Sequence, residues 1–364
     1  MKRKTKKLKW YLLGAAIALV AAGAFFAAIS HRMSLLPKMT FEQMLAYTTQ
    51  DNKDAVITVG ILEDSKISYT VYGNNAAVLP RQEHLYEIGS LTKTFTGALV
   101  CKAIDEGKLD PDQPISAYLD LPDKPYYPTL KRLVTHTSGY RPYYMEPQMA
   151  LNFLRRRGND FYGISPQALH GQIGKVSLQD KDYPFEYSNF GMAVVGAVLS
   201  GVYDQGYPAL MNDYIAQDLG LSHTRISEST GDLSGYWQWK ADDAYLPAGG
   251  LISTIGDMMR YLQLQMSGEL PYLAIGQKEL AAANGTAGSY ASMNIHIDAQ
   301  GIGWMIDREN NILWHNGGTS HFNSYAAFDK DRQLGVVILS NCAPDYRIPA
   351  TVMGVRLMTA LQGR

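Results

Sequence analysis

A serine and a lysine spaced three residues apart, at the start of an apolar helical pattern, constrain the fold and chemistry of this chain more than any other feature. Ser90 and Lys93 follow the segment 86–89 and precede the mostly apolar run 94–100. Side chains three positions apart lie on one face of a helix, a single turn from each other. The helix N-terminus also offers unpaired backbone N–H groups and the positive end of the helix dipole. Such a site could combine a hydroxyl nucleophile, an amine and a binding site for a developing oxyanion.

The composition allows a large globular domain and excludes nucleic acid as the main partner. The chain has 364 residues, of which 46% are hydrophobic, and this is enough apolar material for one large domain or two closely joined ones. Of the 33 Lys and Arg residues, six lie within the first ten positions, which leaves 27 against 34 Asp and Glu. The rest of the chain is therefore acidic, whereas nucleic-acid binding needs a basic face.

The N-terminus combines a basic head with an apolar segment long enough to cross a membrane. Residues 1–9 contain six Lys and Arg and no acid, and residues 10–29 are 20 uncharged, mostly apolar positions. At about 1.5 Å per residue this segment can span a core of roughly 30 Å, with the basic head in the cytoplasm. A cleaved signal peptide is the alternative, although its apolar core usually has only about 7–15 residues. We expect a single-pass cell-membrane protein whose catalytic domain is extracytoplasmic, or a secreted protein if the segment is cleaved.

The chain contains two cysteines, Cys101 and Cys342, both in apolar surroundings. We expect two reduced core residues rather than a disulfide. Their spacing forms no metal-binding motif, and we expect neither a metal nor an organic cofactor.

Patterns of apolar residues predict two groups of strands separated by a long, mainly helical region. A membrane-proximal stretch, 30–50, is followed by the main domain, 51–364, which begins with a β-hairpin. We expect the strands of about 51–90 and 290–364 to form one antiparallel sheet, with 91–289 as a helical lobe. The site would lie in the cleft between the two lobes. The expected strands are 55–62, 66–72, 303–306, 312–315, 323–328 and 335–340, and the expected helices are 41–48, 90–107, 191–199, 256–265 and 348–361.

Two further motifs follow Ser90 in order along the chain. Tyr187 and Asn189 lie 97 and 99 residues after Ser90, at the start of an apolar helical pattern. The segment 315–318, with the sequence HNGG, begins 128 residues after Tyr187, at the end of a strand pattern. Each motif alone is weak evidence, because such residues often form turns or helix caps. The three together, each on the element that its chemistry requires, are much more specific.

With these motifs the chain resembles the serine β-lactamase and penicillin-binding protein superfamily. The nearest branch is that of class C β-lactamases, DD-carboxypeptidases, D-aminopeptidases and family VIII-type esterases. Residues 132–139 are similar to the family's LLTHTSG turn, 185–191 to its F-x-Y-S-N-x-G motif, and 247–257 to its AGGL-x-ST-x-x-D segment. The resemblance covers roughly residues 45–345. It implies an α/β (α+β) fold of the β-lactamase/transpeptidase type, an antiparallel sheet flanked by helices plus a mainly helical lobe, here preceded by a transmembrane helix.

The resemblance also implies a role for each motif residue. Ser90 would attack a carbonyl carbon and form an acyl-enzyme, with Lys93 as a nearby base once its own proton is disfavoured. Tyr187 would relay a proton to the leaving group and later activate water, and the choice of acylation base between Lys93 and Tyr187 stays open. Asn189 would hold the Lys93 side chain, and the N–H groups of Ser90 and Gly318 would form the oxyanion hole. Substrate binding is implied for Asn189, His315, Gly317 and Gly318.

Two histidines depart from the common pattern of this family. His315 stands where many relatives carry lysine, and histidine there is frequent in the peptidase and esterase branches. It would bind a carboxylate poorly at neutral pH, because an unperturbed histidine is mostly uncharged above about 6.5. His321 replaces a glycine near the substrate path, so the shape of the pocket and its specificity stay open. A metal site built on these two histidines lacks a third ligand.

Two other features have structural interpretations. His136 and Ser138 are interpreted as a hydrogen-bonded turn that supports the site. The run of three arginines at 155–157 is interpreted as a solvated helix end.

We expect a membrane-anchored, extracytoplasmic serine hydrolase that cleaves D-alanyl peptides or esters of the cell envelope through an acyl-Ser90 intermediate. Its partners would be a small-molecule or cell-wall substrate and, through the N-terminal helix, the membrane. A class C-type β-lactamase or a broad esterase is the enzymatic alternative, although His315 disfavours a dedicated β-lactamase. A non-catalytic cell-wall binding or sensor protein is the alternative of another class. The presence of Ser90, Lys93, Tyr187 and Asn189 together argues against it.

Overall fold

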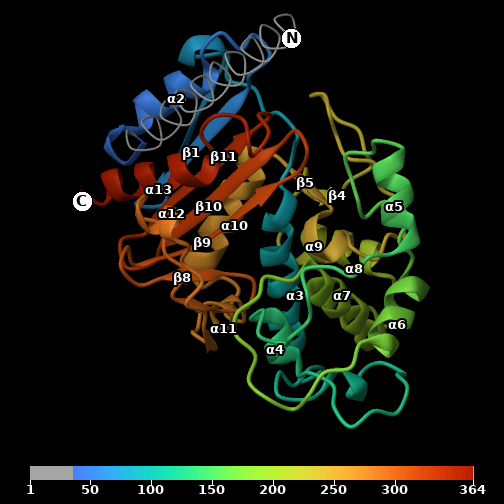
Figure 1. Cartoon of the computed structure of the whole chain (residues 1–364). Coiled ribbons are helices and arrows are strands. Elements are labelled where there is room, and N and C mark those ends of the chain that lie inside the picture. Colours follow the sequence, from blue (N-terminus) through green and yellow to red (C-terminus); the bar gives the residue numbers. More distant parts are fainter. Residues whose placement is uncertain (1–35, 364) are drawn as a thin grey trace, which may run out of the picture.

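An antiparallel sheet of eight strands forms one lobe of the protein, which the computed structural model describes over residues 36–363 (Figure 1). The strand order is β2-β1-β11-β10-β9-β8-β7-β6, so the first strand along the chain, β1, pairs with the last, β11. Strands β8 to β11 are consecutive neighbours and form the expected meander. The strands are β1 Ile57–Glu63, β2 Lys66–Tyr72, β6 Ala281–Ala282, β7 Ala299–Gln300, β8 Met305–Asp307, β9 Ile312–Gly318, β10 Asn323–Asp329 and β11 Leu334–Ser340.

Helices cover both faces of this sheet, which explains why its central strands are buried along their whole length. Helix α13 (Ala350–Leu361), flanked by α2 (Phe41–Thr49), packs on one face, and α10 (Ile255–Ser267) packs on the other (Figure 1). Side chains of a strand alternate between the faces, so β10 sends Tyr325 to the α13 side and Phe328 to the α10 side. Each face therefore has its own apolar core.

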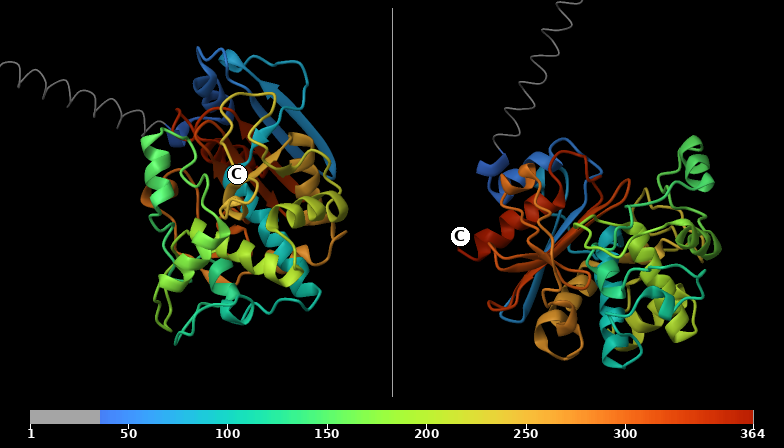
Figure 2. Two further views of the ribbon diagram at one scale, coloured as in Figure 1. Left: turned by 90° about the vertical axis from the view of Figure 1, so that its right-hand side faces the viewer. Right: turned by 60° about the horizontal axis from the view of Figure 1, so that its bottom comes forward.

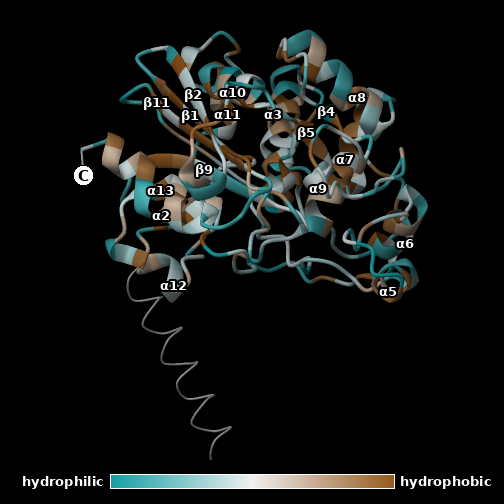
Figure 3. Ribbon diagram, turned by 90° about the horizontal axis from the view of Figure 1, so that it is seen from above, coloured by the Kyte–Doolittle hydropathy of each residue, from teal (hydrophilic) through white to brown (hydrophobic). Residues whose placement is uncertain are grey.

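The second lobe is mainly helical and meets the sheet lobe along α3 (Thr92–Asp105), which is buried over most of its length (Figure 2). Helix α3 contacts α7 (Asn189–Tyr203) and α9 (Leu246–Gly249). Apolar ribbon is concentrated along the strands and α7, where the layers meet (Figure 3). The remaining helices are α4 Leu130–Val134, α5 Pro147–Leu154, α6 Pro166–Lys175, α8 Tyr207–Asp213, α11 Leu273–Gly276 and α12 Gly288–Ala291.

A short three-stranded sheet leads the chain into the turn that carries Ser90. Strand β5 (Leu251–Ser253) is central and pairs with β3 (Tyr86–Glu87) and β4 (Arg225–Ile226). After β3 the chain forms a 3₁₀ turn, Gly89–Leu91, that continues directly into α3. Strands of two or three residues are too short to show a period, so sequence patterns do not predict this sheet.

The predicted antiparallel sheet with flanking helices is confirmed, and the division into lobes differs in one respect. Helix α10 and strand β6 belong to the sheet lobe, although the sequence placed all of 91–289 in the helical lobe. The apolar stripe of α10 predicts that the helix is buried, but not on which layer it packs. Its place on the sheet depends on Gly60 in β1, where a Cβ would lie 2.5 Å from Met259 Sδ.

The predicted membrane anchor, 10–29, and the basic head before it lie outside the described residues. Within residues 36–363, no helix is both long and apolar enough to span a bilayer. Cys101 and Cys342 are buried and unpaired, which confirms the expectation of two reduced core residues. Burial raises the pKa of the Cys101 thiol to about 12 and also raises that of Cys342.

Candidate active site

Ser90 lies in the 3₁₀ turn between β3 and α3, where the backbone comes very close to the end of β9. Gly89 has a φ of +50°, a conformation that favours glycine, and a Cβ there would lie 2.5 Å from the amide nitrogen of Gly318. A Cβ on Gly317 would lie 1.9 Å from the carbonyl oxygen of Ile88. The absence of side chains on these glycines therefore lets the Ser90 turn pack directly on the strand that carries Gly318.

Lys93 is fully buried, and its amine contacts three oxygen atoms. Nζ lies 2.9 Å from Ser90 Oγ, 2.8 Å from Asn189 Oδ1 and 2.6 Å from the carbonyl oxygen of Ala248. Burial lowers the pKa of Lys93 well below its ordinary range, which favours the neutral amine with two N–H bonds and one lone pair. The oxygens of Asn189 and Ala248 can only accept, so they take both N–H bonds. In the neutral amine the lone pair is then left for Ser90 Oγ at 2.9 Å, and the Ser90 hydroxyl can donate to it.

Tyr187 lies against Ser90 and Lys93 on the segment just before α7. Its ring centroid is 4.8 Å from Lys93 Nζ and 4.6 Å from the ring centroid of His136. Burial raises the pKa of the Tyr187 hydroxyl above its ordinary range, and the contact with the Ser90 side chain opposes this only in part. The phenol therefore stays protonated at neutral pH and can both donate and accept a hydrogen bond.

The N-cap of α7 fixes the directions of Tyr187 and Asn189. Ser188 is the N-cap, and its Oγ accepts a hydrogen bond from the backbone N–H of Gly191 at 2.8 Å. The backbone N–H of Ser188 donates to His136 Nδ1 at 3.2 Å. Burial lowers the pKa of His136 well below its ordinary range, so the ring is neutral and Nδ1 can accept. His136 thus supports the tyrosine from behind, in agreement with its structural interpretation.

The backbone N–H of Gly318 points toward the Ser90 turn because hydrogen bonds alternate along β9. The N–H of Thr319 donates to the carbonyl oxygen of Phe322 at 2.9 Å. Successive N–H groups of an antiparallel strand point to opposite edges, so the N–H of Gly318 points away from β10. Strand β8 pairs with that other edge only as far as Trp314, and the Ser90 turn occupies the edge beyond it. The N–H of Gly318 is therefore directed to the side of β9 on which the Ser90 turn lies.

His315 lies on the opposite face of β9 from the pocket. Trp314 and Asn316 line the pocket, so the alternation of the strand places the buried His315 ring on the α3 side. Its centroid is 6.1 Å from that of Tyr187, and its Nδ1 donates to the carbonyl oxygen of Asn316 at 2.6 Å. Burial, with Lys93 as a smaller contribution, lowers the pKa of His315 to about 3, so the ring is neutral. The structure brings Gly317 and Gly318 to the pocket wall, but not His315.

A pocket of about 390 Å³ opens in front of Ser90 and Tyr187. None of the described residues that line it carries a charge. Among its other lining residues, the side chains of Asn316, Asn323 and Tyr290 carry polar groups, and the backbone at the end of β9 adds more. The apolar walls are formed by Phe185, Tyr290, Ile297, Met305, Trp314 and Pro344.

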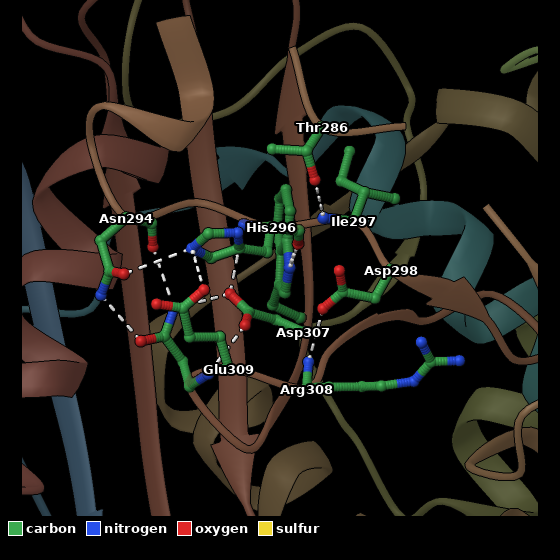
Figure 4. A network of polar contacts seen from close by, with 10 residues as sticks. Thr286, Asn294, His296, Ile297, Asp298, Asp307, Arg308 and Glu309 are labelled. Atoms are coloured by element: carbon green, nitrogen blue, oxygen red, sulfur yellow. Dashed lines mark hydrogen bonds and ion pairs between the residues drawn. The ribbon is translucent and has the colours of Figure 1, made fainter. Parts of the chain in front are cut away.

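A polar network behind this wall holds the segment that carries Ile297 (Figure 4). Asp307 accepts hydrogen bonds from the backbone N–H groups of His296, at 3.2 Å, and Asn310, at 2.8 Å. The indole N–H of Trp314 donates to the carbonyl oxygen of His296 at 3.0 Å. The network thus fixes two lining residues, Ile297 and Trp314, relative to each other.

Glu87 is a buried carboxyl group next to the site that the sequence patterns do not single out. It stands three residues before Ser90 and is 2% exposed. The Thr319 hydroxyl donates to its Oε2 at 2.7 Å, and the Trp237 backbone N–H donates to its Oε1 at 2.6 Å. Burial raises the pKa of Glu87 to about 7, and these two hydrogen bonds oppose the shift. A lone acid among the apolar positions of 86–89 is the signal that could have identified this link between the Ser90 turn and the end of β9.

His321 does not share a site with His315. It lines a second pocket, on the other side of the turn that follows β9, together with the three arginines at 155–157. In the part of the chain that the structure describes, no group of three or more His, Cys, Asp and Glu side chains is placed to hold a metal ion.

The family model described as Beta-lactamase matches residues 42–351, which is most of the chain. The chain belongs to the beta-lactamase family. The resemblance seen in the motifs is therefore confirmed, and the antiparallel sheet with its covering helices is the β-lactamase/transpeptidase-like fold.

Similar proteins include enzymes and homologues of penicillin-binding proteins. The chain is 27% identical to a "Beta-lactamase" of Pseudomonas fluorescens over 344 residues, 80% of this chain and 90% of that one. It is 25% identical over 290 residues to "Protein flp" of Staphylococcus aureus strain MW2, and this match covers 72% of the chain but only 53% of that longer relative. The chain thus spans about half the length of the staphylococcal proteins it matches.

Two solved structures share the fold at low sequence identity. The β-lactamase/D-alanine carboxypeptidase from Yersinia pestis has a TM-score of 0.70 and 18% identity, covering 92% of this chain and 99% of its own. The octameric penicillin-binding protein homologue from Pyrococcus abyssi has a TM-score of 0.69 and 20% identity, covering 88% of this chain and 75% of its own.

Proposed function

We propose that this member of the beta-lactamase family is a serine hydrolase that works through an acyl-Ser90 intermediate. The observation that carries the proposal is the geometry around Lys93. Two oxygens that can only accept, on Asn189 and Ala248, hold both N–H bonds of a neutral amine and leave its lone pair for Ser90 Oγ at 2.9 Å. A serine hydroxyl needs such a base to become a nucleophile.

The contacts of the site support a sequence of proton movements. Lys93 takes the Ser90 proton as Oγ attacks the carbonyl carbon, and the N–H groups of Ser90 and Gly318 stabilise the negative charge on the carbonyl oxygen. Tyr187 is a neutral phenol against both side chains, so it passes the proton from Lys93 to the leaving group as that bond breaks. This assigns Lys93 rather than Tyr187 as the acylation base, because burial lowers the pKa of the amine and raises the pKa of the phenol.

We propose D-alanyl esters and peptides of the cell envelope as the substrate class, with the ester preferred. The sequence motifs and the basic and apolar N-terminus favour this class and an extracytoplasmic, membrane-anchored location. The pocket supports the preference for esters. A peptide that ends in D-alanine, like a β-lactam, presents a carboxylate near the scissile bond, and no charged residue lines the described pocket to pair with it. His315, at the position of the lysine in many relatives, is buried and neutral.

The test is labelling of the full-length chain with a fluorophosphonate and with a fluorescent penicillin. Wild type and Ser68→Ala, a matched serine substitution on the exposed edge strand β2, should be labelled, whereas Ser90→Ala should not. Equal labelling of Ser90→Ala would contradict the proposal. A D-alanyl ester, a D-Ala-D-Ala peptide and nitrocefin are then compared by kcat/KM. The ester should be the best substrate, and faster turnover of nitrocefin would identify a β-lactamase instead.

A further inference from the structure

A second pocket of about 400 Å³ lies next to the Ser90 site and is rich in positive charge. It is lined by Arg155, Arg156 and Arg157, together with Trp237, Ser320 and His321. Ser320 belongs to the turn after β9 and follows Gly318, which lines the Ser90 pocket, by two residues. The two Cα atoms are therefore at most about 7 Å apart. The end of β9 and the turn after it therefore border both pockets.

The three guanidinium groups have no negative partner among the residues that the structure describes. In the described part of the chain, no carboxylate lies within 4 Å of Arg155, Arg156 or Arg157, and no Asp or Glu lines the pocket. Arg157 stacks on the Tyr162 ring at 4.1 Å and donates to Gln238, both neutral groups, while its buried Nε has no hydrogen-bond partner. A polar atom that is buried without a partner is costly, and an anion in the pocket would supply one.

The interpretation of these arginines as a solvated helix end explains only part of the geometry. Arg155 is the C-cap of α5, where a positive charge stabilises the helix dipole. Arg156, however, has a φ of +52° directly after the helix, a position that usually holds glycine. An arginine thus stands at a position whose backbone conformation favours glycine.

The walls of the pocket are fixed by specific contacts. Ser320 Oγ donates to the carbonyl oxygen of Gly158 at 2.9 Å and accepts from the indole N–H of Trp237 at 2.9 Å. His321, which replaces a glycine of the common family pattern, packs on Gly235, where a Cβ would lie 2.6 Å from the imidazole ring. The loop that contains Gly235 therefore packs around the His321 side chain.

We propose that this arginine pocket binds a phosphate group of the substrate, on the alcohol that leaves when the D-alanyl ester is cleaved. The proposal rests on the proposed function and narrows its substrate class to esters of phosphate-bearing alcohols. Arginine forks bind phosphate and carboxylate oxygens in pairs. Three unpaired positive charges favour phosphate, because a single carboxylate would leave two of them uncompensated. The uncharged pocket at Ser90 would hold the acyl group, and the arginine pocket the phosphate.

Direct binding tests the pocket without turnover. Isothermal titration of full-length Ser90→Ala with glycerol phosphate, inorganic phosphate, glycerol and acetate should show binding of the two phosphates that weakens with added salt. Glycerol phosphate should bind more tightly than inorganic phosphate, and glycerol and acetate should bind weakly. Adding Arg156→Gln or Arg157→Gln to the Ser90→Ala protein should reduce its phosphate affinity about tenfold, as expected for a lost charged hydrogen bond. Lys66→Gln, the same charge change at the start of β2, should leave affinity unchanged.

Kinetics then test whether the bound phosphate belongs to the substrate. The ratio of kcat/KM for D-alanyl glycerol phosphate to that for D-alanyl glycerol should be well above one. Arg156→Gln should lower this ratio about tenfold, and Lys66→Gln should keep the wild-type ratio. Equal affinity for acetate and phosphate, or a ratio that does not depend on the arginines, would overturn the inference. Binding of phosphate by Ser90→Ala, with no ester turned over by the wild type, would instead contradict the proposed function.

Discussion

Burial sets the protonation of the groups that surround Ser90, and it acts in opposite directions on acids and bases. It lowers the pKa of Lys93 and raises the pKa of Tyr187, and both shifts favour the neutral form. An ordinary phenol is already neutral at neutral pH, whereas an ordinary lysine amine is charged. The amine is the group that changes role, because removal from water turns a cation into a base. No acidic partner is needed for this change.

Glu87 should make the stability of the protein depend on pH. Its pKa is raised from an ordinary 4.5 to about 7, chiefly by burial. Between these values the unfolded chain binds fewer protons than the folded chain, so the free energy of unfolding falls as the pH rises from 4.5 to 7 and levels off above 7. The loss amounts to roughly 3 kcal/mol.

Urea unfolding of wild type and Glu87→Gln at pH 5, 6, 7 and 8 measures this effect. Glutamine does not ionise, so the variant should lack the slope that Glu87 contributes. Its amide oxygen can still accept from the Trp237 backbone N–H, while its amide N–H can donate to the Thr319 hydroxyl oxygen. Glu63→Gln, at the exposed end of β1, serves as the matched control and should keep the pH dependence of stability that Glu87 contributes. Parallel pH dependence of wild type and Glu87→Gln would show that the Glu87 carboxyl does not titrate in this window.

At the scale of elements, the site depends on the close approach of the end of β9 to the Ser90 turn. Gly317→Ala would place a methyl group 1.9 Å from the carbonyl oxygen of Ile88, so the strand must move away. The N–H of Gly318 would move with it, and we expect labelling by the penicillin probe to slow about a hundredfold, as for a lost oxyanion donor. The free energy of unfolding should fall by about 1–3 kcal/mol.

A glycine in an open position provides the control for this substitution. Gly171 lies in α6, and a Cβ there would meet nothing within 4 Å. Gly171→Ala should leave labelling unchanged and increase stability by up to about 1 kcal/mol, because alanine favours the helix. An unchanged labelling rate in Gly317→Ala would show that the approach of β9 does not control the site.

The long elements and the three motifs were predictable, because each has a repeating pattern or a recognisable order. Periodicity predicts that β9 to β11 are strands, but burial on both faces removes the alternation that tells which side chain points where. This is why His315 could be placed on a strand but not on one of its faces. The partners of Glu87 and the walls of the arginine pocket lie on loops that meet only in three dimensions, so no local pattern indicates these contacts.

At the scale of the whole molecule, α3 joins the two lobes into one folding unit. Phe95 on α3 stacks on Tyr261 of α10, with ring centroids 4.0 Å apart, while α3 also contacts α7 and α9 in the helical lobe. Phe95→Ala should therefore weaken both lobes together, by about 3–5 kcal/mol. Phe95→Leu, which preserves most of the volume, should cost less than about 1.5 kcal/mol.

Denaturant unfolding followed by tryptophan fluorescence and by circular dichroism tests this coupling. The two signals should give one coincident transition in wild type and in both variants, as expected for a cooperative unit. A separate transition for either signal in Phe95→Ala would show that the lobes unfold independently.

The way in which Lys93 is held has a consequence for the covalent form of the protein. Once Ser90 is esterified, its oxygen carries no hydrogen, and the lone pair of Lys93 loses its donor while Asn189 and Ala248 still hold both N–H bonds. An incoming water molecule can donate to that lone pair, which would turn the water oxygen toward the ester. The acyl-enzyme would thus bind the water molecule that hydrolyses it. A durable inhibitor of this protein would have to occupy the place of that water, and rapid reaction with Ser90 alone would not suffice.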